Sequence, residues 1–248
     1  MTKELKIAYE KLKELDRVKS EFVSFASHQV KTPMTVIKGY ASMIADGTYG
    51  AVSEKIKETS EKIIEATDRL VALVNNILNV RKIEEGKLEY TFEETDMSAL
   101  VTSVVSDLAP SAKGKGIELS LSVAPRVPPV RADSLKLRQV IQNVIDNAVK
   151  YTAEGSVKVS VSHEETGKEV LISVADSGSG MEPPELKRLF EPFHRDALTA
   201  KTTQGSGLGL YIAKQIMNAH QGAIWATSEG IGKGSSFFIR IPTFGSRG

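Results

Sequence analysis

The first 85 residues carry apolar side chains at a spacing of seven, which restricts this part of the chain to long helices. Ala8, Leu15 and Phe22 follow this spacing, with Lys and Glu on either side. Each helix would present a narrow apolar stripe of the kind found at a coiled-coil seam. The pattern predicts one helix over residues 3–46 and a second over residues 53–85.

Two such helices joined by a short turn form an antiparallel hairpin. A hairpin of this width cannot bury both of its stripes by itself. We therefore expect two chains to pair as a homodimer whose hairpins form a four-helix bundle. The alternative is that the hairpin docks on the remainder of its own chain.

After Gly86 the pattern changes to short strands mixed with helices. Alternation predicts strands at 88–92, 117–123, 157–162, 170–175, 224–227 and 236–241. Helical spacing predicts helices at 98–113, 133–151 and 207–219, with two short helical pieces between 176 and 206. Because no regular βαβ rhythm is present, we expect an α/β sandwich with helices on one face of a mixed sheet.

Composition excludes several classes of function. The 32 basic and 31 acidic residues leave a net charge of +1, so no nucleic-acid partner is indicated. There is no cysteine, and the four histidines form no HxxxH pair, so we expect no thiolate or zinc site. No apolar run approaches the ~20 residues of a membrane helix. We expect a soluble, cytoplasmic chain, and a membrane attachment elsewhere in a longer protein stays open.

The predicted helix at 133–151 carries two asparagines, Asn143 and Asn147, four residues apart and so on one face. Asparagine is a poor helix former, so the presence of two asparagines inside one predicted helix needs an explanation. An amide oxygen is a hard, neutral ligand for Mg²⁺, which also binds phosphates. Solvated surface asparagines are the alternative.

Two glycine clusters follow, at 176–180 after a predicted strand and at 205–209 opening a predicted helix. Glycines allow the backbone to approach a ligand closely, and a helix N-terminus offers free N–H groups to phosphate. Asp176, at the strand end, could accept a hydrogen bond from the exocyclic amine of adenine. No GxxxxGK[ST] motif is present, so this is not a P-loop protein.

The ordered motifs resemble those of histidine-kinase ATP-binding domains, which share the GHKL-type fold of gyrase-type ATPases and their chaperone relatives. The matching motifs are Asn143…Asn147, Asp176-x-Gly178-x-Gly180, Phe190-Glu-Pro-Phe193 and Gly205-x-Gly207-Leu-Gly209. Residues 24–37 resemble the phosphoacceptor box, and residues 81–88 resemble the end of the second bundle helix. The resemblance covers essentially the whole chain.

The resemblance implies a multidomain protein, the catalytic core of a two-component sensor histidine kinase. Residues 1–20 would be a coiled-coil signalling helix, 21–86 the dimerisation and histidine phosphotransfer domain, and 87–248 the catalytic ATP-binding domain. The partners implied are a second copy of the chain and the receiver domain of a response regulator. An upstream sensor domain would precede residue 1 in the intact protein.

The same resemblance assigns ATP and Mg²⁺ to particular residues. Asn147 would coordinate Mg²⁺ with Asn143 beside it, and Asp176 would bind the adenine amine. Tyr151 would pack on the adenine, while Lys150 and Arg195 would contact phosphates. The glycine motifs add Gly178, Gly180, Gly205, Gly207, Leu208 and Gly209 to the nucleotide site. Residues 196–204 would form a lid, braced by Phe190 and Phe193 as core aromatics.

His28 would be the phosphoacceptor. Thr32 lies one helical turn away, and Pro33 removes the helical hydrogen bond to the carbonyl of Gln29, which should bend the helix there. In the family, a threonine at this place helps to orient water that hydrolyses the aspartyl phosphate of the regulator.

Gln29 departs from the family pattern, which has Glu or Asp directly after the histidine. The amide oxygen of Gln29 can accept a hydrogen bond from the N–H of the imidazole nitrogen that does not attack. It cannot balance the positive charge that develops on the imidazole. The difference between charged and neutral hydrogen bonds is about 1–1.5 kcal/mol, or roughly tenfold in rate. We expect a slowed kinase. The alternatives are a nucleotide-binding pseudokinase that acts as scaffold or phosphatase, and a gyrase- or chaperone-type ATPase.

Overall fold

The computed structural model describes residues 3–163, 168–194 and 205–244 and divides the chain into two compact units. Unit 1 spans Met1–Leu88 and unit 2 spans Glu89–Gly248. No helix within the described ranges combines the length and the apolarity that a bilayer-spanning segment needs.

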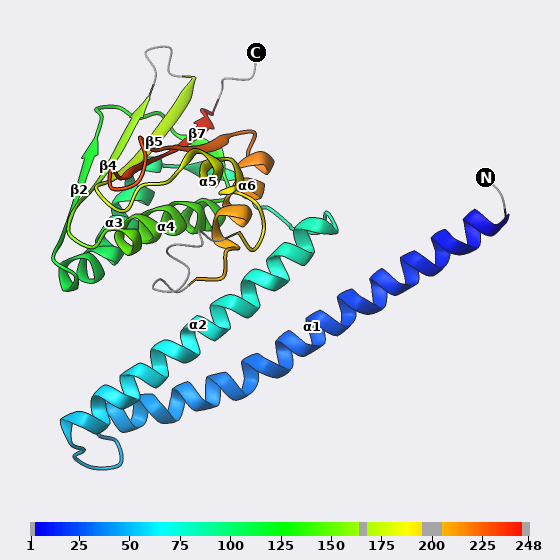
Figure 1. Ribbon diagram of the computed structural model, residues 1–248, viewed down its shortest axis with the longest axis horizontal. Coiled ribbons are helices and arrows are strands. Elements are labelled where there is room, and N and C mark those ends of the chain that lie inside the picture. The colour runs from blue at the N-terminus through cyan, green and yellow to red at the C-terminus, as the bar shows by residue number, and fades with distance from the viewer. Residues whose placement is uncertain (1–2, 164–167, 195–204, 245–248) are drawn as a thin grey trace. The chain divides into compact units, whose positions relative to one another are not determined.

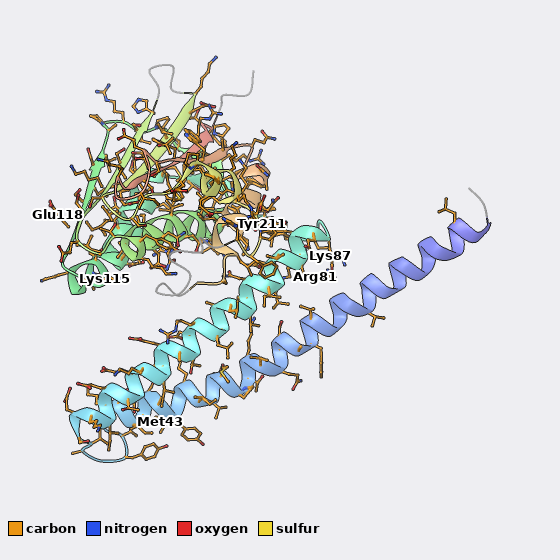
Figure 2. All side chains as sticks on the ribbon, in the orientation of Figure 1. Met43, Arg81, Lys87, Lys115, Glu118 and Tyr211 are labelled. Carbon is orange, nitrogen blue, oxygen red and sulfur yellow. The ribbon has the colours of Figure 1, made fainter. Side chains whose placement is uncertain are left out.

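Unit 1 is a hairpin of two long helices, α1 (Lys3–Ala45) and α2 (Glu54–Glu84). The turn between them contains Gly47 and Gly50, both at positive φ. The beginning of α1 extends beyond the last turn of α2 (Figure 1). In Figure 2, Met43 lies near the turn and Arg81 near the opposite end of α2. The predicted helical hairpin is therefore present.

The seam between the two helices is built from small side chains. Ser27 and Ala41 are buried on α1, and Ser60, Thr67 and Val74 are buried at a spacing of seven on α2. The larger apolar side chains stay exposed, namely Phe25, Val36, Ile37, Tyr40, Met43, Ile56, Ile63, Leu70 and Leu73. Within one chain, the hairpin thus buries its small stripe and leaves its large stripe uncovered.

Unit 2 contains a five-stranded sheet in the order β2-β4-β5-β7-β6. Its strands are β2 (Ile117–Val123), β4 (Gly155–His163), β5 (Glu169–Asp176), β6 (Ala223–Thr227) and β7 (Ser235–Pro242). The β2–β4 pair is parallel, and the other pairs are antiparallel. A separate antiparallel pair joins β1 (Glu93–Thr95) to β3 (Val130–Ala132).

Three helices cover one face of this sheet: α3 (Met97–Gly114), α4 (Ser134–Tyr151) and α6 (Gly209–Ala219) (Figure 1). The strands bury every second residue against them, as Val170, Ile172 and Val174 do on β5. A short helix, α5 (Pro183–Arg188), lies in the connection between β5 and α6. The predicted mixed sheet with helices on one face is confirmed.

The strand predicted at 88–92 is wrong. The first strand is β1, at Glu93–Thr95, and the residues before it are irregular. The alternation of Tyr90 and Phe92 has another cause, because both rings pack against the ring of His220, with centroids 5.7 and 4.9 Å away. An extended segment that places every second side chain on one neighbour imitates a strand.

Three smaller expectations also changed. Strand β3 was missed because it is only three residues long and follows prolines. Of the two short helical pieces, α5 is present, residues 189–193 form turns, and residues 195–204 lie outside the described residues. Helix α6 begins at Gly209 because Gly207, at φ +69°, is not helical.

Candidate functional site

Asp176 stands at the end of β5 with one carboxylate oxygen fixed by backbone. Its Oδ1 accepts hydrogen bonds from the N–H of Gly178 at 2.9 Å and of Ser235 at 3.2 Å. Burial raises the pKa of Asp176, and these two hydrogen bonds oppose that rise. Oδ2 accepts no hydrogen bond from the described residues, so it can accept one from a ligand amine.

The first glycine cluster is packed too tightly for any side chain. A Cβ on Gly178 would lie 2.4 Å from the carbonyl oxygen of Tyr151. A Cβ on Gly180, at φ +65°, would lie 2.0 Å from the carbonyl oxygen of Gly230. The N–H of Ser179 donates to the carbonyl of Tyr151 at 3.1 Å. The loop after β5 is thus held against the end of α4.

Sequence reasoning missed Gly234 and Ser235, which close this loop from the other side. A Cβ on Gly234, at φ +70°, would lie 2.0 Å from the carbonyl oxygen of Asp176. Ser235 holds the Asp176 carboxylate through its N–H. The available signal was the run of glycines at 230–234, which reads equally well as an ordinary hairpin turn.

The second glycine cluster shapes the entry to α6. A Cβ on Gly207 would lie 2.8 Å from the carbonyl oxygen of His194. The side chain of Leu208 is fully buried, so it belongs to the core, and only its backbone can face a ligand. The N–H of Leu208 donates to Ser206 Oγ at 3.3 Å. The first N–H groups of α6 remain suited to bind an anion.

Asn143 joins α4 to the start of α6, because its Nδ2 donates to the carbonyl of Gly209 at 3.1 Å. A Cβ on Gly209 would come within 3.4 Å of this amide. Asn147, one turn later, is half-buried and has no hydrogen-bond partner among the described residues. Its amide can therefore serve a ligand directly.

The described residues contain no group of three or more His, Cys, Asp or Glu side chains that could hold a metal ion. A resident ion in an all-carboxylate cage does not fit this part of the chain. The amide oxygen of Asn147 does fit Mg²⁺, which keeps several waters and is commonly shared between one or two protein ligands and substrate phosphates.

Lys150 and Tyr151 lie at the C-terminal end of α4. Lys150 Nζ is 5.5 Å from the centroid of the Tyr151 ring. A Cβ on Gly205 would lie 2.8 Å from the same Nζ, so the lysine also reaches the second glycine cluster. The predicted residues of α4 and the two glycine clusters therefore meet at one end of unit 2. Arg195 lies outside the described residues.

The Phe190–Phe193 motif corrects one expectation. Phe193 is not a core aromatic, since its side chain is 66% exposed and its φ is +60°. Its backbone instead packs where a Cβ on Gly207 would be. Phe190 is half-buried, with Lys214 Nζ 5.9 Å from its ring. For His194 the sequence predicts no role; its Nε2 lies 2.7 Å from Oε2 of Glu185.

The phosphoacceptor motif lies on α1 in unit 1. His28, Gln29 and Thr32 are all exposed. The hydroxyl of Thr32 donates to the carbonyl of His28 at 3.3 Å. Helix α1 continues through Pro33 without interruption, and the proline leaves the carbonyl of Gln29 without its helical donor. The imidazole of His28 is thus accessible to a reactant from solvent.

Comparison with known proteins gives two family matches in this order along the chain. Residues 18–86 match the His Kinase A (phospho-acceptor) domain. Residues 132–244 match the histidine kinase-, DNA gyrase B- and HSP90-like ATPase family. The sensor protein SrrB of Staphylococcus aureus strain N315 is 33% identical over 230 residues, which are 92% of this chain and 39% of SrrB.

Solved structures give the same result. The crystal structure of full-length ShkA in complex with AMPPNP has a TM-score of 0.73 at 30% identity, covering 90% of this chain and 45% of ShkA. The mycobacterial sensor histidine kinase MprB has a TM-score of 0.52 at 28% identity, over 61% of this chain and 97% of that structure. The chain spans less than half the length of SrrB and of ShkA. With a phosphoacceptor domain followed by an ATPase-type domain, the chain belongs to the sensor histidine kinases and carries their catalytic core.

Proposed function

We propose that this chain binds ATP with Mg²⁺ in unit 2 and transfers the γ-phosphoryl group to the imidazole of His28. An unprotonated ring nitrogen attacks the γ-phosphorus, the bond to the bridging oxygen breaks, and ADP leaves with the electron pair. A receiver-domain aspartate of a response regulator then takes the phosphoryl group. The exposed imidazole of His28, in a chain that also has a nucleotide site, carries this proposal.

The geometry of unit 2 supports the assignment of roles at the nucleotide. Asp176 Oδ2 would accept from the adenine amine, and the amide of Asn147 would bind Mg²⁺. Lys150 would place its charge beside the phosphates, with Arg195 expected to assist. When bound, Mg²⁺ would neutralise phosphate charge during transfer. That ShkA is solved with AMPPNP, an ATP analogue, supports an adenine nucleotide here.

The surface of unit 1 supports a homodimer. The exposed side chains of the large stripe include Ile37 and Met43 on α1 and Ile56 and Ile63 on α2. A second copy of the hairpin would bury these stripes in a four-helix bundle. The first residues of α1 would then form a coiled coil that connects to an upstream sensor domain.

Thr32 supports a second activity, hydrolysis of the regulator's aspartyl phosphate. Its hydroxyl proton points to the carbonyl of His28. The lone pairs of its oxygen remain available to accept a hydrogen bond from water. We propose that Thr32 orients the attacking water in this reaction.

Incubation with γ-labelled ATP and Mg²⁺ tests the kinase. The expected product is labelled protein whose label is lost in acid and kept in alkali, as for a phosphohistidine. Steady release of labelled phosphate without labelled protein would instead identify an ATPase of the gyrase or chaperone type. Neither label nor hydrolysis, with nucleotide still bound, would identify a pseudokinase.

We expect a Gln29→Glu variant to autophosphorylate roughly tenfold faster than the wild type, because a carboxylate balances the charge that develops on the attacking imidazole. The initial rate of labelling at saturating ATP measures this. A Gln142→Glu variant, at an exposed position of α4 in unit 2, is the matched control and should leave the rate unchanged. Equal rates for Gln29→Glu and wild type would contradict our account of this residue.

A further inference from the structure

His220, directly after α6, is a buried histidine with no role in the site described above. Its side chain is 5% exposed. Nδ1 lies 2.8 Å from the carbonyl oxygen of Ile216, and Nε2 lies 3.0 Å from the backbone N–H of Asp133. A carbonyl only accepts and an N–H only donates. His220 is therefore neutral, with its proton on Nδ1.

The side chain of Asp133 accepts two further hydrogen bonds, and the residue is itself only 7% exposed. It is the N-cap of α4, with Oδ1 accepting from the N–H of Lys136 at 3.0 Å. Its Oδ2 accepts from the N–H of Thr91 at 3.0 Å. Thr91 belongs to the segment that enters unit 2 from unit 1, and its neighbours Tyr90 and Phe92 pack on the His220 ring.

The contact between His220 and Asp133 has a counterpart halfway along α4, at the N-terminus of α6. There Asn143 donates to Gly209 at the nucleotide site. The two ties are ten residues apart on α4 and eleven apart along α6. At 1.5 Å per residue these stretches are about 15 and 16 Å long. The two contacts are therefore separated by nearly the same distance along α4 and along α6.

We propose that His220 is a positioning residue for nucleotide binding, which ties the far ends of α4 and α6 to each other and to the entering segment 90–92. The two helices carry the asparagines and the second glycine cluster, so fixing their far ends fixes the alignment of these groups. A displacement of the entering segment then reaches the nucleotide site through Asp133 and His220. The inference rests on the proposed nucleotide site but not on phosphoryl transfer.

Two substitutions of His220 separate this role from simple packing. The amide of His220→Asn takes the place of Nδ1 and leaves the Asp133 N–H without an acceptor. The longer side chain of His220→Gln can bring a carbonyl oxygen to the place of Nε2. We expect the dissociation constant of Mg·ADP to rise roughly tenfold in His220→Asn and to stay within about twofold of wild type in His220→Gln.

A third variant tests the entering segment. Asp133→Ser keeps an N-cap acceptor and the backbone N–H to His220, but it lacks the second oxygen that accepts from Thr91. We expect a several-fold weaker affinity for Mg·ADP in this variant. His163→Asn, a substitution at the end of β4, is the matched control and should bind as the wild type does.

Calorimetric titration of the full 248-residue chain with Mg·ADP, at a temperature where each variant is folded, measures all four affinities. Unchanged affinity in His220→Asn, or equal losses in His220→Asn and His220→Gln, would overturn the proposal. If His220→Asn does not fold, Asp133→Ser decides, and wild-type affinity there overturns it. Wild-type protein that binds Mg·ADP but takes up no phosphate would refute the kinase and leave this result standing.

The protonation of His220 gives a second readout. Burial lowers the pKa of His220, although the hydrogen bond to the carbonyl of Ile216 and the carboxylate of Asp133 oppose this. Tyr90, whose ring packs on His220, has a raised pKa and stays neutral. A base with a lowered folded-state pKa stabilises the fold above its unfolded pKa of about 6.5 and loses that contribution as the pH falls. Denaturant titrations should show the stability of unit 2 decreasing below this pH in the wild type. In His220→Gln the decrease should be smaller, and equal decreases would contradict a neutral His220.

Discussion

A His28→Gln variant will take up no phosphate from γ-labelled ATP, while its affinity for Mg·ADP remains that of the wild type. Glutamine has no nucleophilic nitrogen, because its amide lone pair is delocalised into the carbonyl. Since the residues proposed to bind the nucleotide all belong to unit 2, loss of the imidazole in unit 1 should not alter binding. Labelling with acid and alkali treatment measures the first effect, and calorimetry measures the second.

The matched control is His163→Gln, which replaces a histidine at the end of β4 and should be labelled as the wild type is. Label that persists in His28→Gln with unchanged acid lability would place the phosphoacceptor on another histidine. Label that persists but resists acid would indicate a hydroxyl acceptor instead, and the proposed reaction would be wrong.

An Asp176→Asn variant will bind Mg·ATP and Mg·ADP roughly 10- to 100-fold more weakly. Oδ1 can still accept from Gly178 and Ser235, so the loop should keep its conformation. In place of Oδ2, however, an N–H donor would face the adenine amine, which is also a donor. The loss of a charged hydrogen bond, worth about 1.5–3 kcal/mol, gives the expected range. Calorimetric titration measures it.

Stability separates this effect from unfolding. Because burial raises the pKa of Asp176, its ionised form is disfavoured in the folded state at neutral pH. Removing the charge should therefore leave the melting temperature of unit 2 equal or higher. Asp146→Asn, which removes an exposed carboxylate from α4, should change neither affinity nor stability. A lowered melting temperature in Asp176→Asn would show that the carboxylate supports the fold rather than the ligand.

Much of the architecture was readable from the sequence because its signals are long and local. The heptad stripes extend over many turns, and the alternation in β4 and β5 coincides with burial under the helices. The glycine clusters were also readable, since a positive φ or a close backbone contact leaves no other residue possible at Gly180 and Gly207.

The features that were missed depend on partners far away in the sequence. The alternation of Tyr90 and Phe92 cannot be told from a strand without knowing that His220, about 130 residues later, lies beneath both rings. From the sequence alone, a histidine at the end of a helix is equally compatible with a favourable positive charge, whereas the two hydrogen bonds of His220 require a neutral ring. The exposure of Phe193 likewise accompanies a left-handed backbone conformation, with φ of +60°, that the local sequence does not predict.

The small side chains at the seam of the hairpin also bear on whether the folding of unit 1 depends on protein concentration. Ser60, Thr67 and Val74 bury little apolar area within one chain, so in the proposed homodimer most of the free energy of folding of unit 1 would come from contacts with the second chain. Unit 2 buries its own apolar core, so its folding rate should be independent of protein concentration. The helices of unit 1 should instead form in a second-order step that depends on protein concentration. Dilution should therefore unfold unit 1 while unit 2 of the same polypeptide stays folded.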